Sequence, residues 1–444
     1  MSTPRTSIAF HTMGCKTNFS ETSTISSEML SHGYKKVSYK DKADIYVLNT
    51  CSVTENADKE ARKLIRQARR LNPVAKIAVI GCYAQLQPGQ ISTIPGVDLV
   101  LGAKEKFNLL SHLNTLNEKN ESTIVRSPIG NTKSFYPSFT NGERTRSYLK
   151  VQDGCNYSCT FCTIPMARGR SRSDTIKNTV KIAQKIADAG TKEIVLTGIN
   201  IGDFGSDGED FLQLITTLDN IKGIDRFRIS SIEPNLLTDD IISFCADSNK
   251  FVPHFHIPLQ SGSNPILKNM KRRYTTNLYE SRVHFIKQLI PDCCIGVDVI
   301  VGYPGEENDH FKETKVFLES LDISYLHVFS YSQRKDTLAA TMENHVTKEE
   351  KELRSKALHI LSNEKRHQFY NQFENTVRPV LIEKSNNVIT QGFTDNYIKV
   401  HIEENISIQN TIVSVSYTHL RAHETLRYRG WRLVRGKKKG GGGG

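Results

Sequence analysis

Short apolar segments alternate with segments of helical periodicity along most of the chain. In the first part, the apolar segments are residues 7–12, 45–49, 76–81 and 97–101. Continuous apolar runs of this length are typical of parallel strands that are buried on both faces. Helical spacing follows the first of them at residues 20–32. Residues 1–118 are therefore predicted to form a doubly wound parallel α/β sheet.

The alternation resumes after a polar, weakly patterned stretch at residues 119–146, which is predicted to be a linker. Strands are then predicted at residues 148–152, 193–197, 226–230, 254–258, 295–301 and 325–330. Helices are predicted between them at residues 174–189, 211–221, 237–246, 276–289 and 310–320. This alternation predicts a partial (β/α)6 barrel over residues 147–345, an α/β fold whose active site lies at the carboxyl ends of its strands.

The last part of the chain has a different pattern. Thr347-Lys348-Glu349-Glu350 has the composition of a capping box and predicts the start of a connecting helix within residues 346–374. Alternating segments at residues 377–383 and 397–400 then predict strands of a small β domain over residues 375–414.

Three cysteines follow the first predicted barrel strand in a C-x3-C-x2-C frame: Cys155, Cys159 and Cys162. Soft thiolates at this spacing bind an iron–sulfur cluster, bind zinc or form a disulfide. Three thiolates leave one iron of a four-iron cluster open, whereas structural zinc needs a fourth ligand nearby. No Cys or His lies between Cys162 and Cys245. The loop also resembles the radical S-adenosylmethionine (radical-SAM) signature, with the aromatic Phe161 before the third cysteine.

Three more cysteines, Cys15, Cys51 and Cys82, each follow one of the first three predicted strands. Because the carboxyl ends of parallel strands share one edge of a sheet, these thiols are predicted to converge into a second three-thiolate metal site. The alternative is that they are free cysteines of a buried core. The other cysteines, Cys245, Cys293 and Cys294, have no metal-binding spacing and are predicted to be core or surface thiols.

The helix predicted after Cys51 carries six cations on one face. They are Lys59, Arg62, Lys63, Arg66, Arg69 and Arg70. The stripe is either a solvated helix face or a phosphate-binding surface for RNA beside the predicted metal edge.

Composition narrows the class of protein. With 38% hydrophobic and 24% charged residues, the chain is typical of a soluble globular protein. It has no apolar run long enough for a membrane span, and no apolar signal core follows its start. Nine cysteines then favour metal or redox chemistry in a reducing cytoplasm. Of the net charge of +12, residues 416–444 contribute +7, so the body of the chain is only mildly basic.

Together, these motifs resemble the methylthiotransferase family of radical-SAM enzymes over roughly residues 7–410. They are Thr-Met-Gly-Cys-Lys-Thr-Asn around Cys15, Leu-Asn-Thr-Cys-Ser-Val-Thr around Cys51, Ile-Gly-Cys-Tyr-Ala-Gln around Cys82, the loop of Cys155, and residues 256–263 and 298–306. The resemblance implies an N-terminal methylthiotransferase domain, a radical-SAM barrel and a C-terminal RNA-binding β-barrel.

Within this family, the chain is most similar to the branch that modifies N6-threonylcarbamoyladenosine next to the anticodon of tRNA. This similarity lies in the strings at residues 14–18, 167–172 and 198–203. The sibling branches methylthiolate isopentenyladenosine in tRNA or an aspartate of a ribosomal protein, and both remain alternatives. A third possibility, from another class, is a non-catalytic iron–sulfur module that binds RNA or senses redox state.

The resemblance implies two [4Fe-4S] clusters and S-adenosylmethionine as cofactors. Cys155, Cys159 and Cys162 would hold the cluster that cleaves S-adenosylmethionine, and Cys15, Cys51 and Cys82 an auxiliary cluster that carries the sulfur. A second S-adenosylmethionine would donate the methyl group. The expected partners are a tRNA anticodon stem-loop and an electron donor such as flavodoxin or ferredoxin, with no membrane. Candidates around the cofactor, mostly from strand-end positions, are Phe161, Asn200, Ser231, Glu233, Gln260 and Asp298.

The family pattern fails after about Ser414. The chain then runs through Arg-rich sequence, three lysines and five glycines. Residues 417–425 look like translated adapter sequence, so residues 415–444 are predicted to be a non-native tail and the β-barrel incomplete. The alternative is a genuine basic RNA-binding tail.

Overall fold

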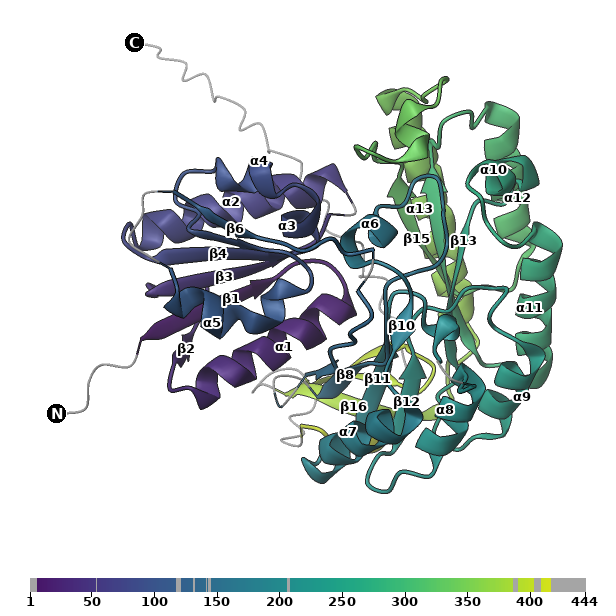
Figure 1. Cartoon of the computed structure of the whole chain (residues 1–444). Helices are drawn as coiled ribbons and strands as arrows, with labels where there is room; N and C mark the ends of the chain where they lie inside the picture. Colours follow the sequence, from purple (N-terminus) through teal and green to yellow (C-terminus); the bar gives the residue numbers. More distant parts are fainter. Residues whose placement is uncertain are drawn as a thin grey trace, which may run out of the picture.

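The computed structural model describes residues 6–52, 54–116, 121–130, 132–140, 142, 145–205, 208–385, 390–402 and 409–416. An α/β layer at the amino end lies beside a larger curved α/β unit, and a small antiparallel sheet follows (Figure 1). Among the described helices, none is both long and apolar enough to cross a membrane.

The first unit is a parallel sheet with strand order β2-β1-β3-β4-β5-β6. Its strands are β1 (Ser7–Thr12), β2 (Lys35–Val37), β3 (Ile45–Thr50), β4 (Lys76–Gly81), β5 (Leu99–Leu101) and β6 (Thr123–Val125). Its helices are α1 (Lys16–Ser31), α2 (Glu55–Leu71), α3 (Cys82–Leu86), α4 (Pro88–Ser92) and α5 (Leu109–Asn114). The doubly wound sheet predicted from the sequence is confirmed.

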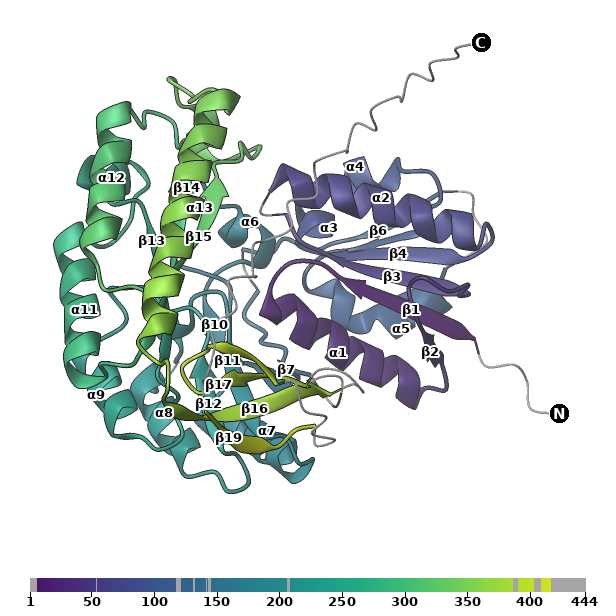
Figure 2. The ribbon, with the colours of Figure 1, turned by 180° about the vertical axis from the view of Figure 1, so that it is seen from behind.

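Helices cover both faces of this sheet (Figure 2). Leu64 and Ile65 of α2 pack on one face in a cluster with Val79, whereas Ile25 of α1 packs on the other face with Val47. The helix predicted to begin at residue 20 begins at Lys16 instead. The three-residue strands β2 and β6 were not predicted, because their sequences are short and mostly exposed.

The second unit is built on two sheets with strand orders β12-β11-β8-β7 and β13-β14-β15. Its strands are β7 (Ser138–Phe139), β8 (Arg146–Lys150), β9 (Gln152–Asp153), β10 (Arg172–Ser173), β11 (Glu193–Thr197), β12 (Arg226–Ile229), β13 (His254–Gln260), β14 (Cys294–Val301) and β15 (Tyr325–Ser330). Its helices are α6 (Ile164–Arg168), α7 (Ile176–Asp188), α8 (Phe211–Asp219), α9 (Asp239–Asp247), α10 (Asn264–Asn269), α11 (Thr276–Leu289) and α12 (Asn308–Ser320).

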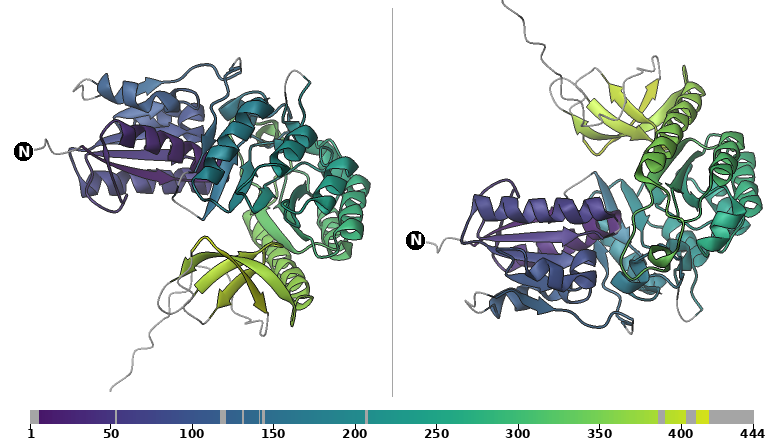
Figure 3. Two further views of the ribbon diagram at one scale, coloured as in Figure 1. Left: turned by 90° about the horizontal axis from the view of Figure 1, so that it is seen from below. Right: turned by 90° about the horizontal axis from the view of Figure 1, so that it is seen from above.

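The two sheets join into one arc of parallel strands. The Ile232 amide donates a 3.0 Å hydrogen bond to the His256 carbonyl, and Phe227 pairs with Phe251 in an isolated bridge. Seen along the strands, the arc is lined on its outer side by helices (Figure 3). The predicted partial barrel is therefore present, and β7, from the range expected as a linker, adds an antiparallel strand at one edge.

The inner face of the arc is polar. On β11, Ile194 and Leu196 belong to the hydrophobic core shared with the helices, so Glu193 and Thr197 face inward. The same alternation on the neighbouring strands places these polar residues inside the arc: Arg146, Arg226, Arg228, His254, His256, Asp298 and His327.

A long helix and a small sheet complete the described chain. The helix α13 (Lys348–Asn371) begins with the predicted capping box, in which Thr347 and Glu350 bond each other's backbone. The sheet is antiparallel in the order β18-β17-β16-β19, from β16 (Val377–Ser385), β17 (Thr390–Thr394), β18 (Lys399–Ile402) and β19 (Ile412–Ser416). In the described residues it is an open four-stranded sheet.

The small sheet contacts the starts of the barrel strands. Arg226 Nη2 donates to the Pro379 carbonyl at 2.8 Å, and Arg228 Nη2 donates to the Asp395 carbonyl at 3.2 Å. β19 extends to Ser416, slightly beyond the point where the family pattern was expected to fail. Of the predicted non-native tail at residues 415–444, the part from residue 417 onward lies outside the described residues.

Candidate active site

The loop of Cys155, Cys159 and Cys162 follows β9 and is fixed by backbone hydrogen bonds. The Cys155 amide donates to the Gly169 carbonyl at 3.0 Å, and the Cys162 amide donates to the Cys159 carbonyl at 3.1 Å. The loop borders a cavity of about 520 Å³. The cavity is lined by Cys155, Asn156, Tyr157, Ser158, Cys159, Thr160, Cys162, Pro165, Met166, Arg170, Asp336, Thr337 and Leu338.

The chemistry of these thiols fits a strongly cationic ligand. Burial raises the pKa of Cys155 to about 11 and that of Cys162 to about 12, and it also raises the pKa of Cys159. Without a metal, the three groups are therefore neutral thiols at physiological pH. Iron would supply the positive charge that stabilises them as thiolates.

The described thiols are spaced more widely than the ligands of a single bound ion. A tetrahedral zinc site with Zn–S distances of about 2.3 Å brings its sulfurs roughly 4 Å apart. In the described residues, the one set of three candidate ligands with all ligand atoms within 4.8 Å is His256, Asp298 and His327. Neither cysteine set is gathered within that distance in the part of the chain that the structure describes.

Arg272 is a site residue that the sequence analysis missed. Its Nη1 donates to Cys159 Sγ at 3.2 Å, and its Nη2 pairs with the carboxylate of Glu233. The predicted candidate Glu233 thus acts on Cys159 through Arg272. No spacing rule could link these residues, because they come from three different loops.

The other three cysteines lie where the parallel-strand rule predicts. β1, β3 and β4 are neighbours in the sheet. Cys15 is the N-cap residue of α1, Cys51 follows the end of β3, and Cys82 is the first residue of α3 directly after β4. Cys15 lies near enough to Cys82 to influence the pKa of that thiol, which burial raises.

A glycine allows the close approach of two of these loops. Gly14 has a φ of +89°, and a Cβ there would lie 2.7 Å from Cys51 Cβ and 2.9 Å from Cys51 Sγ. A side chain would be strained by the backbone conformation and would also collide with the thiol.

The two cysteine sets face each other across the interface between the first unit and the barrel. Thr163, next to Cys162, donates through Oγ1 to the carbonyl of Ser52, next to Cys51, at 3.5 Å. On the same side, Arg334 Nη2 donates to Ser52 Oγ at 2.7 Å. The edge of the N-terminal sheet therefore lies over the carboxyl ends of the barrel strands.

A buried ionic network joins the same two units. Glu21 of α1 accepts hydrogen bonds from Arg168 Nη1 at 2.9 Å and from Lys150 Nζ at 3.1 Å, and it also pairs with Lys106 at 2.5 Å. Burial opposes the charge on Glu21, yet Arg168 and the two lysines hold the pKa of its carboxyl well below the usual range. Asp153 bonds Arg168 as well, at 2.9 Å.

The remaining strand-end candidates differ in their surroundings. Asn200 is buried and neither polar atom of its amide has a hydrogen-bond partner, so it fits a residue that awaits a ligand. Phe161 packs edge-on against Tyr303 with ring centroids 6.5 Å apart. Gln260 ends β13 with a φ of +68°, and Ser231 is half-buried just beyond β12.

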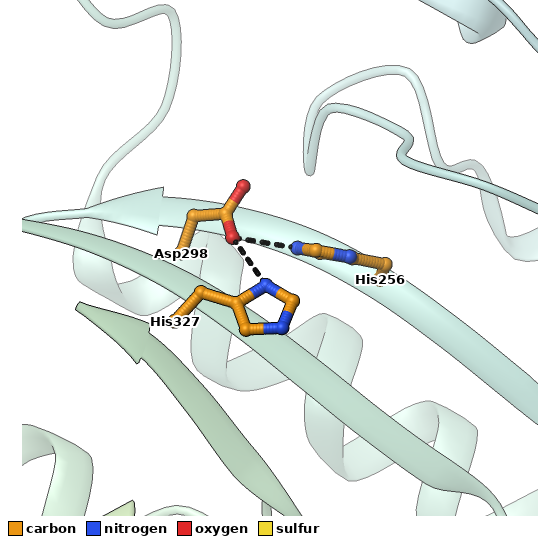
Figure 4. Close-up of side chains that lie close together, drawn as sticks. All are labelled: His256, Asp298 and His327. Atoms are coloured by element: carbon orange, nitrogen blue, oxygen red, sulfur yellow. Dashed lines mark hydrogen bonds and ion pairs between the residues drawn. The ribbon is translucent and has the colours of Figure 1, made fainter. Parts of the chain in front are cut away.

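Asp298 lies on the inner face of the arc, within β14. His256 Nε2 lies 2.8 Å and His327 Nδ1 3.1 Å from the same Asp298 oxygen (Figure 4). Although burial alone would raise the pKa of Asp298, the two histidines hold it well below its usual range. The pKa of Lys16, at the start of α1, is also affected by this interior. Burial lowers it to about 8, and the charges of Arg228 and Arg146 contribute to this lowering.

Some of the basic side chains of α2 form hydrogen bonds or ion pairs within the protein. Arg69 Nη2 bonds the Gly96 carbonyl at 2.5 Å, and Arg62 Nη1 donates to the Tyr83 hydroxyl at 3.1 Å. Lys59 and Lys63 form exposed ion pairs within the helix. Contact of this face with RNA stays a prediction, and it rests most on the exposed Arg66 and Arg70.

Comparisons with known proteins agree with this arrangement. Residues 7–102 match Uncharacterized protein family UPF0004, and residues 149–318 match the Radical SAM superfamily. The chain is 41% identical over 420 residues to "Threonylcarbamoyladenosine tRNA methylthiotransferase MtaB" of Bacillus subtilis (strain 168), covering 92% of this chain and 93% of the relative. It is 33% identical over 382 residues to a "tRNA-2-methylthio-N(6)-dimethylallyladenosine synthase" of Clostridium botulinum (strain Hall), covering 84% and 85%.

Solved structures support the fold. The radical S-adenosylmethionine methyltransferase TsrM from Kitasatospora setae, with tryptophan and an S-adenosylmethionine analogue bound, superposes with a TM-score of 0.55 at 13% identity, over 73% of each chain. With two cysteine sets on facing edges, both family matches and near full-length similarity at 41% identity, the chain belongs to the radical-SAM methylthiotransferase family.

Proposed function

We propose that this protein transfers a methylthio group to C2 of N6-threonylcarbamoyladenosine next to the anticodon in tRNA. The observation that carries the proposal is the position of two three-thiol sets on facing edges, linked by the Thr163–Ser52 hydrogen bond of 3.5 Å. A redox sensor or a simple RNA-binding module does not need two such sets around one interface. The higher identity to the relative named for threonylcarbamoyladenosine, 41% against 33%, favours this substrate over the dimethylallyl one.

Cys155, Cys159 and Cys162 would hold one [4Fe-4S] cluster, and Cys15, Cys51 and Cys82 would hold the other. When bound, these clusters and S-adenosylmethionine supply the radical, the sulfur and the methyl group that acid–base chemistry cannot provide at an aromatic C–H. The chain's own residues position and protect them. Arg272 fixes Cys159 against Glu233, and Asn200 offers a free amide beside the barrel mouth.

Each domain proposed from the sequence has its own role in this reaction. Residues 1–118 carry the auxiliary cysteines, residues 147–345 carry the radical-SAM loop, and residues 375–414 form a sheet that would contact RNA together with the basic face of α2. An electron donor such as flavodoxin or ferredoxin would reduce the radical-SAM cluster. The site of action would be the cytoplasm, where the tRNA substrate is.

Nucleoside mass spectrometry tests the proposed function. The protein is reconstituted without oxygen, and S-adenosylmethionine, a reductant and tRNA unmodified at C2 are added. A methylthio mass gain on threonylcarbamoyladenosine is the expected result. A gain on isopentenyladenosine alone would keep the mechanism but assign the chain to the sibling substrate. Production of 5′-deoxyadenosine with no gain on either nucleoside would contradict both tRNA substrates.

A further inference from the structure

We propose that His256, Asp298 and His327 form a binding site for one divalent transition-metal ion, with ligands distinct from both cysteine sets. The three side chains supply two imidazole nitrogens and one carboxylate oxygen, a combination that proteins use to bind iron(II) and zinc. This site does not depend on the identity of the substrate, because the geometry of the three side chains alone defines it.

The three side chains come from three adjacent strands of one parallel sheet. β13, β14 and β15 follow one another in that sheet, and Asp298 of β14 is paired directly with His327 of β15. His256 of β13 is paired with Gly296, two residues before Asp298. Alternation along the strands therefore turns all three side chains to the same face, the inner face of the arc. Strands, rather than loops, hold the candidate ligands, which favours a precise site.

The candidate ligand atoms already lie at the separations that a bound ion requires. His256 Nε2 is 2.8 Å and His327 Nδ1 is 3.1 Å from the same Asp298 oxygen, Oδ1 (Figure 4). One ligand atom from each of the three residues lies within 4.8 Å of the others. An ion about 2.1 Å from each ligand, with bond angles of about 90°, places neighbouring ligand atoms roughly 3.0 Å apart. Small rotations of the side chains would therefore admit the ion.

The charge and the exposure of the site also suit a cation. Although burial raises the pKa of Asp298, the hydrogen bonds from the two histidines keep it well below its usual range, so the carboxylate is ionised at neutral pH. Neutral imidazole is the form that binds metals. The side chain of His327 is 48% exposed and that of Asp298 is 22% exposed, so water or a substrate oxygen can reach the positions that three protein ligands leave open.

A tyrosine beside the site restricts the two histidine rings. The ring centroid of Tyr325 is 5.2 Å from that of His327 and 6.5 Å from that of His256. Gly296 makes room for this tyrosine, because a Cβ there would collide with the Tyr325 hydroxyl. The same hydroxyl lies 3.2 Å from Nε2 of His254, which fixes the tyrosine ring. Packing against a fixed ring preorganises both histidines as ligands.

A hydrogen-bond network without a metal is the competing explanation for these contacts. In such a network, both histidines donate an N–H to Asp298. Yet both nitrogens approach one oxygen, and among the described residues no hydrogen bond reaches the other oxygen, Oδ2. Convergence on one oxygen is the arrangement of a monodentate carboxylate beside two imidazole ligands, so the geometry favours the metal site.

Binding of manganese(II) to the reconstituted protein tests the site. The six cluster cysteines would already be bound to iron, and oxidised [4Fe-4S] clusters give no electron paramagnetic resonance signal. Loss of the signal of free Mn²⁺ during a titration therefore counts the ions that bind elsewhere. Wild-type protein should bind about one Mn²⁺ per chain, and Zn²⁺ should displace it, because a nitrogen and oxygen site prefers zinc to manganese.

Variants assign the bound ion to these residues. Asp298→Asn and His327→Ala should each weaken Mn²⁺ binding by roughly 100-fold, since each removes a ligand. His327→Gln should also lose the ion, although its amide can still donate a hydrogen bond to Asp298 and so support the fold. His284→Ala is the matched control, because it removes an exposed histidine on α11 and should bind Mn²⁺ as wild type does. Iron content and thermal unfolding midpoint are measured for each variant.

A folded, iron-loaded wild-type protein that binds no Mn²⁺ would overturn the proposal and leave the hydrogen-bond network as the explanation. Equal Mn²⁺ affinity in wild type, Asp298→Asn and His327→Gln would overturn it too, because the ion would then bind elsewhere. Methylthiolation of tRNA is measured separately in the same preparations. Wild-type protein that binds Mn²⁺ through these residues but modifies neither nucleoside would contradict the proposed function and still support the metal site.

Discussion

Arg168, the last residue of α6, grips Glu21 of α1 with two hydrogen bonds, Nη1 to Oε1 at 2.9 Å and Nη2 to Oε2 at 3.0 Å. Both side chains are at most 1% exposed. The pair lies between the N-terminal sheet and the radical-SAM loop, so it fixes the relative position of the two cysteine sets. Its charges sit beside Cys82, whose thiol pKa Arg168 lowers against the effect of burial.

Breaking this pair should destabilise the protein strongly. Glu21→Gln leaves Arg168, Lys106 and Lys150 without their shared carboxylate, and an uncompensated buried charge costs about 3–5 kcal/mol. Urea unfolding of the reconstituted protein measures the loss. Glu60→Gln is the matched control, because it breaks an exposed pair with Lys63 and should cost less than about 1 kcal/mol. Similar midpoints for the two variants would contradict the structural role of the pair.

Each cysteine set should account for its own half of the iron. Cys159→Ala and Cys51→Ala should each lower iron content by about four atoms per chain. Cleavage of S-adenosylmethionine to 5′-deoxyadenosine should be lost in Cys159→Ala and retained in Cys51→Ala. Cys245→Ala, which changes a buried core thiol, should keep all iron and cleavage activity. Full iron in either site variant would reject the assignment of its ligands.

Gly14 should be needed because a side chain there would collide with Cys51, and not only because of its backbone conformation. Gly14→Ala places a Cβ 2.7 Å from Cys51 Cβ at a φ of +89°, and it should lower the iron held by the auxiliary cysteines. Gly33 has a φ of +90° with open space around it. Gly33→Ala should therefore show a similar backbone penalty of about 1 kcal/mol with unchanged iron. Equal iron loss in both variants would point to backbone strain instead.

In the metal-free protein, the radical-SAM thiols should lose their protons only at a pH above that of an ordinary cysteine. Burial raises the pKa of Cys155 to about 11 and that of Cys162 to about 12, so the neutral thiol is favoured in the fold. Alkylation by iodoacetamide, followed by peptide mass spectrometry, should be slow at pH 8 and keep rising with pH well past the ordinary value of about 8.5. In urea, the alkylation rate of both thiols should stop rising near that ordinary pKa. If the alkylation rate of the folded protein also stopped rising at about pH 8.5, the thiols of the loop would be exposed to solvent rather than buried.

The convergence of Cys15, Cys51 and Cys82 could be predicted because it depends on one strong rule, that parallel strands end on a common edge. The central strands and helices were also visible in the apolar pattern. Thr276–Leu289, for example, has the bounds expected from the sequence.

The contacts between loops could not be predicted. Arg272 meets Cys159 across 113 residues, and Arg168 meets Glu21 across 147. Charged side chains of this kind read as surface residues in a sequence, because nothing local shows that their partners will be buried with them. Short exposed strands such as Lys35–Val37 were missed for a related reason: their neighbours in space, not their own composition, make them strands.

The Thr163–Ser52 contact has a consequence for how the protein matures in the cell. Since the two thiol sets belong to units that are joined at this contact, a cluster bound by one set would stabilise the joined arrangement that both sets share. During iron starvation, chains with empty thiol sets would have a weaker interface between the N-terminal unit and the barrel, and water would reach the charged residues around Glu21.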